Sequence, residues 1–251
     1  SRLFDELTSA IRVDLPGEDE PVSLDIALSG LHNPDREVRK ATAEAVTESL
    51  QPGLRTRAYV FNTLLQDKAT SDRLRSFPHW LATRNLSNEA SDESVQALIE
   101  AVKGRYDLAR SWYRTKAKLL GIDRLADYDR MAAIAVDDEK IEWEQGREIV
   151  QEAFTSLAPE AGDVVERFFD ERWIDAPPGP NKRGGAFSAS TVPSVHPYVM
   201  LNYTDKRRDV LTLAHELGHG LHQTLAGRQG IFHQDTPLTV AETASVFAEE
   251  L

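Results

Sequence analysis

Apolar residues recur at helical spacing over most of residues 1–175, and proline or glycine separates the periodic segments. Ser91 is placed to cap the start of the longest segment, and Gly121 is placed to end it. The pattern predicts helices over five ranges, which are 35–50, 54–75, 91–120, 138–157 and 160–172.

The pattern changes after residue 172. Residues 176–187 are rich in proline and glycine, which helix and strand interiors tolerate poorly. Gly185–Thr191 and Tyr198–Thr204 look extended and are expected to form an antiparallel pair. Helical spacing resumes over 206–226 and from 237 to 251. We therefore expect a mainly α protein with one small antiparallel β element, divided into a helical arm, 1–175, and a second segment, 176–251.

Composition excludes several classes of protein. The chain has 251 residues, a formal net charge of -12 and no cysteine, so disulfide scaffolds, thiol catalysis and iron–sulfur clusters are excluded. Most of the negative charge lies in the helical arm, and an acidic chain is not expected to bind nucleic acid. No apolar run is long enough for a membrane span, and the first residues lack a signal-peptide layout, so a cytoplasmic protein is expected.

Three histidines fall within the predicted helix 206–226, in the segment AHELGHGLHQ. His215, Glu216 and His219 spell the motif H-E-x-x-H. Residues four apart share one face of a helix, so the two imidazoles can reach one metal ion. Glu216 then lies beside them, where it can accept a proton from water. The alternative interpretation is an exposed helix that carries two histidines by chance.

A catalytic zinc site needs a third protein ligand and an open position for water. The metzincin pattern requires glycine at 222 and histidine at 225, but this chain has His222 and Leu225. The other arrangement takes a glutamate from a following helix, and Glu242 occupies that place in the last predicted helix. We therefore expect one Zn²⁺ per chain, held by the two motif histidines and Glu242. The ligand types alone do not exclude cobalt or manganese.

Other residues of the same two helices lie close to these candidates. Glu249 follows the candidate glutamate by seven residues and so shares its face, where it can orient an imidazole; the alternative is an exposed acidic helix end. His222 shares the face of His219 and is expected beside the site or in the core rather than as a ligand. Gly218 and Gly220 weaken a helix, so we expect them to permit close approach of another backbone or helix.

The sequence resembles oligoendopeptidase F and its relatives among the thimet-oligopeptidase-like zinc peptidases. The resemblance is carried by HELGHGLH and TPLTVAETASVFAE, preceded by KRGGAFSAS and HPYVMLNYT. It extends upstream to FNTLLQDKATSDRLRSFP, RNLSNEASDESVQALIEAV and RYDLARSWYRTKAKLLGIDRLADYD. Essentially the whole chain therefore takes part in it.

The resemblance implies a helical zincin core and a cytoplasmic metalloendopeptidase that cuts short, unstructured oligopeptides in a channel between helical halves. It assigns zinc to His215, His219 and Glu242, and the role of general base to Glu216. Zinc lowers the pKa of bound water from 15.7 to about 7, and the glutamate takes the proton during attack on the scissile carbonyl.

The extended segment before the motif helix is expected to bind substrate. A peptide can pair with an exposed strand through main-chain hydrogen bonds, which accept many sequences. The candidates are strand 186–190, with Ala186, Phe187 and Ser188, and strand 198–203. The alternative is that the two strands pair only with each other.

The family's enzymes extend beyond both ends of this chain, so we expect an internal fragment whose partners include the remaining segments of a full-length peptidase. The family's later segment, which supplies tyrosine and histidine donors to the tetrahedral intermediate, has no counterpart here; Tyr203 and His196 are the candidates to replace them. Two other functions stay open. One is a helical peptide-binding domain without independent catalysis, and the other is a zinc aminopeptidase.

Overall fold

The computed structural model describes residues 2–134, 140–179, 182 and 184–251. Its contacts divide the chain into two compact units, residues 1–136 and 137–251. Among the described residues, no helix combines the length and the apolar character that crossing a membrane requires. The units are considered separately.

The first unit is helical, with one two-stranded antiparallel sheet of β1 (Arg12–Val13) and β2 (Val22–Ser23). Two 3₁₀ turns, η1 (Gly30–His32) and η2 (Asp127–Asp129), complete it. Its helices are α1 (Arg2–Ser9), α2 (Leu24–Ser29), α3 (Arg36–Leu50), α4 (Leu54–Leu74), α5 (Ala82–Ser87), α6 (Asp92–Gly104) and α7 (Tyr106–Leu119).

The predicted helix 91–120 is two helices in the structure. Ser91 caps α6 as expected, since its hydroxyl accepts a hydrogen bond from the Ser94 backbone N–H at 3.1 Å. The break follows Gly104, a weak helix former, and Arg105 leaves the helical region at φ -119° and ψ 23°. Gly121, with φ 67°, ends α7 as expected.

A buried ion cluster ties α3 to η2 within the first unit. The Asp129 carboxylate is fully buried and accepts hydrogen bonds from Arg36, Arg39 and the backbone N–H of Ala126. Burial opposes ionisation of Asp129, but these hydrogen bonds outweigh it and lower the pKa from 3.8 to about 2.

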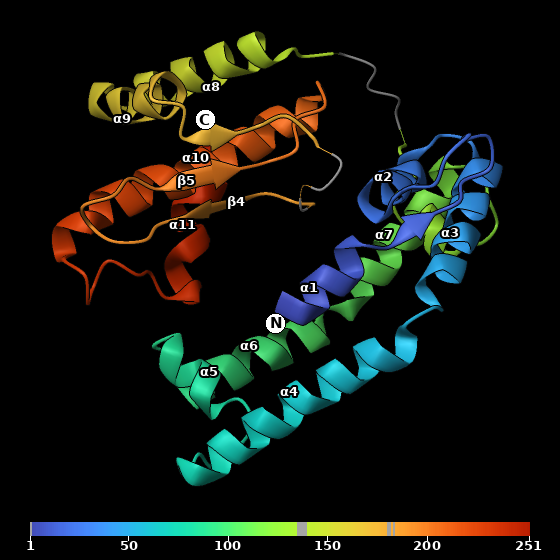
Figure 1. Ribbon diagram of the computed structural model, residues 1–251, viewed down its shortest axis with the longest axis horizontal. Helices are drawn as coiled ribbons and strands as arrows, with labels where there is room; N and C mark the ends of the chain where they lie inside the picture. Colours follow the sequence, from blue (N-terminus) through green and yellow to red (C-terminus); the bar gives the residue numbers. More distant parts are fainter. Residues whose placement is uncertain (1, 135–139, 180–181, 183) are drawn as a thin grey trace. The chain divides into compact units, whose positions relative to one another are not determined.

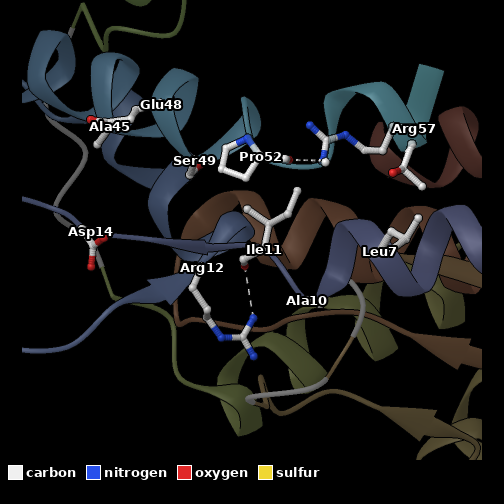
Figure 2. A pocket seen from close by; sticks show the side chains of 12 residues that line it. Leu7, Ala10, Ile11, Arg12, Asp14, Ala45, Glu48, Ser49, Pro52 and Arg57 are labelled. Atoms are coloured by element: carbon white, nitrogen blue, oxygen red, sulfur yellow. Dashed lines mark hydrogen bonds between the residues drawn. The ribbon is translucent and has the colours of Figure 1, made fainter. Parts of the chain in front are cut away.

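An open cavity of about 490 Å³ lies in this unit, between α1, β1, α3 and the start of α4. Figure 2 shows the side chains that line it. Two guanidinium groups border it, and both are bonded to backbone carbonyls. Arg12 donates to Ile11 at 3.2 Å, and Arg57 donates to Pro52 at 3.0 Å. The cavity contains none of the predicted site residues.

The second unit is built around α10 (Arg207–Ala226), which is contacted by the remaining helices and by a small sheet (Figure 1). The other helices are α8 (Trp143–Leu157), α9 (Pro159–Asp170) and α11 (Leu238–Glu249), with a 3₁₀ turn, η3 (Gly227–Gln229). The part of the predicted range 138–157 before residue 140 lies outside the described residues. The hydrophobic core of the second unit is formed by Phe154, Val165, Phe168, Leu213 and Leu217 with their neighbours.

The two predicted extended segments do pair, as β4 (Phe187–Ala189) and β5 (Tyr198–Met200), antiparallel with Ser188 opposite Val199. The sheet also has a third strand, β3 (Ile174–Asp175), which lies parallel to β5 on its other side. β4 is therefore an edge strand. The β element is larger than expected because a two-residue strand has too little pattern to be detected.

The contacts do not divide the chain at residue 175. Helices α8 and α9, which the sequence pattern assigned to the helical arm, pack against α10 and supply much of its core. The division lies at residue 136, because the apolar faces of these two helices are buried against the motif helix.

Candidate metal and peptidase site

Helix α10 presents the motif residues. In its first turn, the Asp209 carboxylate accepts hydrogen bonds from the backbone N–H groups of Thr204 at 2.7 Å and Lys206 at 3.2 Å, which lie just before the helix. Two turns further along, His215 and His219 lie on one face, with ring centroids 4.8 Å apart.

Both histidines point at one oxygen of Glu242 on α11. The Nε2 atoms of His215 and His219 each lie 3.2 Å from Glu242 Oε2. Donor atoms on these three residues all lie within 4.8 Å of one another. Zinc bonds of about 2.0–2.2 Å in a tetrahedron separate neighbouring ligand atoms by about 3.4 Å, and the two nitrogen–oxygen distances of 3.2 Å are close to that spacing.

Ser245 holds the Glu242 carboxylate in this position. Its buried hydroxyl donates to Glu242 Oε2 at 2.7 Å from one turn further along α11. This hydrogen bond, aided by the two imidazoles and opposed by burial, lowers the pKa of Glu242 below its ordinary 4.5. The carboxylate is therefore ionised at neutral pH, as a metal ligand must be.

Glu249 contacts the other side of His215. Its Oε1 lies 2.6 Å from His215 Nδ1. A carboxylate accepts only, so we assign the imidazole proton to Nδ1, which leaves the Nε2 lone pair facing Glu242. Burial lowers the pKa of His219, against the raising effect of Glu242, which favours the neutral imidazole that a metal requires.

Glu216 lies beside this cluster and is only 6% exposed. Burial raises its pKa above 4.5, the Glu242 charge adds to the rise, and His215 opposes it. Its carboxylate also accepts a hydrogen bond from the backbone N–H of Ser188. A carboxylate with a raised pKa is suited to both taking and returning a proton near neutral pH.

A cavity of about 520 Å³ lies over the cluster, between β4, α10, α11 and the loop before α11. Ala186, Phe187 and Ser188 line it from the strand, and the partly buried His222 lines it from α10. Asp235 contributes an acidic group from the loop.

Gln223 joins the site helix to the edge strand. The Ser188 hydroxyl donates to Gln223 Oε1 at 2.8 Å, and Gln223 Nε2 donates to the Ser188 carbonyl at 3.2 Å. Side chains of α10 therefore bind both main-chain groups of Ser188: Glu216 accepts from its N–H, and Gln223 donates to its C=O.

His196 and Tyr203 do not line this cavity. His196 stacks on Trp173, with ring centroids 4.0 Å apart, and its Nδ1 lies 2.9 Å from the Pro197 carbonyl oxygen. Tyr203 is buried and its hydroxyl donates to the Ile141 carbonyl at 2.9 Å; burial raises its pKa to about 12. Neither side chain is therefore part of the cavity over the histidine–glutamate cluster, although His196 lines a separate cavity beside it.

The two glycines of the motif helix mark close contacts. A Cβ at Gly218 would lie 2.7 Å from the Ala244 carbonyl oxygen of α11. A Cβ at Gly220 would lie 2.6 Å from the Phe168 ring of α9. The expectation of close approach is confirmed at both positions.

Sequence reasoning missed Ser245, Gln223 and Gln234. Ser245 follows Glu242 by three residues, which puts both on one helix face, so its position carried a usable signal. Gln223 and Gln234 form hydrogen bonds with residues 35 and 43 positions away in the chain, and a local sequence pattern does not predict such contacts.

Comparison with known proteins agrees with this arrangement. The model of peptidase family M3 matches residues 29–251. The chain belongs to peptidase family M3. The region of the M3 match includes both units in large part and all residues of the histidine–glutamate cluster.

Among curated M3 relatives, the chromosomal oligoendopeptidase F of Lactococcus lactis subsp. cremoris is 28% identical over 222 residues, which are 88% of this chain and 37% of the relative. An oligoendopeptidase F homolog of Borreliella burgdorferi is 28% identical over 228 residues, covering 88% of this chain and 38% of the relative. The resemblance to oligoendopeptidase F is thus confirmed. The chain spans well under half the length of these relatives.

Two solved structures share the fold. PZ peptidase A with inhibitor 2 superposes with a TM-score of 0.85 at 18% identity, covering 99% of this chain and 46% of that one. Oligoendopeptidase-F of Enterococcus faecium gives a TM-score of 0.57 at 18% identity, covering 99% and 38%. The mainly α fold expected from the sequence is that of these peptidases.

Proposed function

We propose that this protein is a zinc-dependent endopeptidase that hydrolyses short oligopeptides. The observation that carries the proposal is the convergence of two imidazole nitrogens on Glu242 Oε2, with a buried glutamate beside them. His215, His219 and Glu242 would hold one Zn²⁺ per chain, and Glu249 would orient His215. The spacing and chemistry of these donors fit zinc.

Zinc, when bound, supplies Lewis-acid polarisation of the scissile carbonyl and lowers the pKa of water. Glu216 is the general base: its carboxylate takes a proton from the attacking water. The same carboxyl group then returns the proton to the nitrogen of the leaving amine, so the peptide bond breaks with no net change at Glu216.

We propose that substrate pairs with the outer edge of β4 on either side of Ser188, whose own N–H and C=O are bound by Glu216 and Gln223 of α10. Val199 donates its backbone N–H to Trp173 next to β3, so Ser188, opposite Val199, turns its N–H and C=O away from β5. Peptide groups alternate in direction along a strand, so Ala186 presents its main chain to the same edge. Ala186 and Phe187 would contact substrate from the strand, and His222 would contact it from α10. We no longer assign this role to Tyr203 or His196 at the zinc cavity.

An aminopeptidase is the second candidate, because Asp235 lines the cavity and an acidic group there can hold a free N-terminus. Peptides blocked by N-acetylation separate the two. An endopeptidase cleaves the acetylated peptides at the same rate as free peptides, whereas an aminopeptidase leaves them intact. In an aminopeptidase, Asp235→Asn should also abolish the preference for peptides with a free N-terminus.

Because the chain spans 37% of a full relative, we propose that further segments of a longer peptidase complete the catalytic site and supply the donors to the developing oxyanion. Peptide binding without turnover is the alternative for the 251-residue chain. Comparing hydrolysis by this chain with hydrolysis by a version extended at both ends tests this proposal; strong turnover by the chain alone would overturn it.

Glu216→Gln tests the general-base role of Glu216. The substitution is made in whichever version of the protein, this chain or the extended one, hydrolyses peptide. The amide cannot take the proton, so kcat should fall by about 100-fold or more while zinc content is unchanged. Glu250→Gln, at the exposed residue that follows α11, is the matched control and should keep full activity. Normal rates in Glu216→Gln would refute the general-base role.

A further inference from the structure

A second cavity, of about 220 Å³, adjoins the zinc cavity. Ser190, Gln223 and Gln234 line both cavities and form the wall between them. The second cavity continues past this wall, between the loop 192–197 and the end of α10. The two cavities are therefore neighbours that share these three lining residues.

The edge of β4 leads toward this second cavity. The main chain of Ser188 faces this edge, where Glu216 and Gln223 bind it, and Ser190 is the next residue at the same alternation. Ser190 lines both cavities, so it marks where a chain paired along the edge passes from one to the other.

The walls define what the second cavity accepts. Val192, Pro193 and Val195 give it an apolar side. No aspartate or glutamate among the described residues lines it. Arg167 lies over the Trp173 ring at 4.8 Å, and its guanidinium is paired with the Glu171 carboxylate at 2.8 Å.

The glutamines of the shared wall are also committed to the protein. Gln234 is 7% exposed and donates to the Thr191 carbonyl at 2.9 Å, while both polar atoms of Gln223 bond Ser188. These bonds fix the wall and leave it with little capacity to bind a charged group. The cavity thus suits an uncharged side chain with an apolar body.

We propose that the second cavity is a side-chain subsite of the peptidase, one that binds a branched aliphatic or aromatic residue of the substrate near the scissile bond. The inference rests on the proposed function for its substrate, an oligopeptide. It makes residues of the loop 192–197 and η3 determinants of peptide preference.

Gly227 gives a way to fill the cavity without disturbing the backbone. It has helical torsions, φ -53° and ψ -28°, which any residue adopts. A Cβ there would meet only Pro193, at 3.9 Å, an ordinary contact. Because Gly227 and Pro193 both line the cavity, a methionine at 227 would occupy it.

The test measures peptide binding rather than turnover. Zinc-loaded protein carrying Glu216→Gln, which cannot hydrolyse the probe, is titrated with fluorescent N-acetylated peptides. The peptides carry Gly, Leu or Phe at each of three positions on either side of one site. We expect one position where Leu and Phe bind at least about tenfold more tightly than Gly.

Adding Gly227→Met should abolish that preference and leave binding of the Gly peptide unchanged. The neighbouring exposed Arg228→Met should change nothing, and equal zinc content and unfolding midpoint exclude a folding defect. Val195→Ala, which enlarges the cavity, should shift the preference toward Phe.

The proposal is overturned if no position prefers large side chains, or if folded Gly227→Met and Val195→Ala both keep the original preference. If the version extended at both ends binds these peptides selectively but, with Glu216 intact, hydrolyses none of them, the proposed catalysis is refuted and the subsite stands.

Discussion

Ser245 controls Glu242 from a fully buried position. Its hydroxyl is the nearest hydrogen-bond donor to the oxygen that faces both histidines. Without it, the carboxylate can rotate away, because Glu242 itself is exposed to solvent.

Ser245→Ala should weaken zinc affinity by about tenfold while the fold stays intact, since removing a residue that orients a ligand typically costs 10–100-fold. Thr243→Ala, on the exposed side of α11, is the control. Competition with a zinc chelator measures the difference. Equal affinities in the two variants would show that Ser245 does not position the ligand.

Asp129 is the corresponding buried carboxylate of the first unit, and it should make stability depend on pH. Its pKa is lowered from the ordinary value of 3.8, expected in the unfolded chain, to about 2 in the folded protein. The stabilisation is therefore complete above about pH 4 and is lost as the pH falls toward 2, and a shift of this size amounts to about 2 kcal/mol.

Asp129→Asn should lower the free energy of unfolding at neutral pH by about 3 kcal/mol, because it leaves Arg39 buried without its partner charge. Urea unfolding of both proteins between pH 7 and 2 measures this difference. The difference should shrink below pH 4. A difference that stays constant down to pH 2 would contradict the assignment.

At the residue scale, spacing predicted the histidine pair, whereas Glu242 came from the need for a third ligand and from the family resemblance. His215 and His219 share a face because they are one helical turn apart, and Glu249 could be related to the site by its heptad spacing from Glu242. Tyr203 and His196 could not be placed from sequence, since their surroundings depend on α8 and on Trp173, which are distant in the chain.

At the scale of elements, the site depends on how closely α11 crosses α10. Gly218 is the crossing point, where the Ala244 carbonyl and Ser245 Cα lie 2.7 and 2.8 Å from the position of an added Cβ. Backbone atoms cannot rotate aside as a side chain can. A methyl group there must push the two helices apart and carry Glu242 away from the histidines.

Gly218→Ala should therefore lower stability by about 1–3 kcal/mol and also weaken zinc binding. Gly104→Ala is the control: nothing lies within 4 Å of its Cβ position at the end of α6, so it should be neutral or slightly stabilising. Thermal unfolding with and without zinc measures both effects. A fully stable Gly218→Ala that binds zinc normally would contradict the close packing.

The elements themselves were partly predictable. Long amphipathic segments such as α3, α4 and α10 appear close to where periodicity placed them. The break after Gly104 was not foreseen, because apolar spacing continues across it. The unit in which α8 and α9 pack depends on which surface buries their apolar faces, and a linear pattern does not contain that information.

At the scale of the whole molecule, the candidate metal site lies entirely in the second unit. Residues 137–251 contain 20 acidic and 10 basic residues, so most of the net charge of -12 lies in the unit that holds the site. Metal binding should consequently depend on three residues of α10 and α11 and be insensitive to Asp129→Asn in the other unit.

Zinc content after exhaustive dialysis tests the central claim most directly. The wild-type chain should retain about one equivalent of zinc, and His219→Ala should retain almost none, with His233→Ala, an exposed loop histidine, as the control that keeps it. A wild-type chain that holds no metal, or a His219→Ala variant that holds as much as the wild type, would contradict the zinc site on His215, His219 and Glu242.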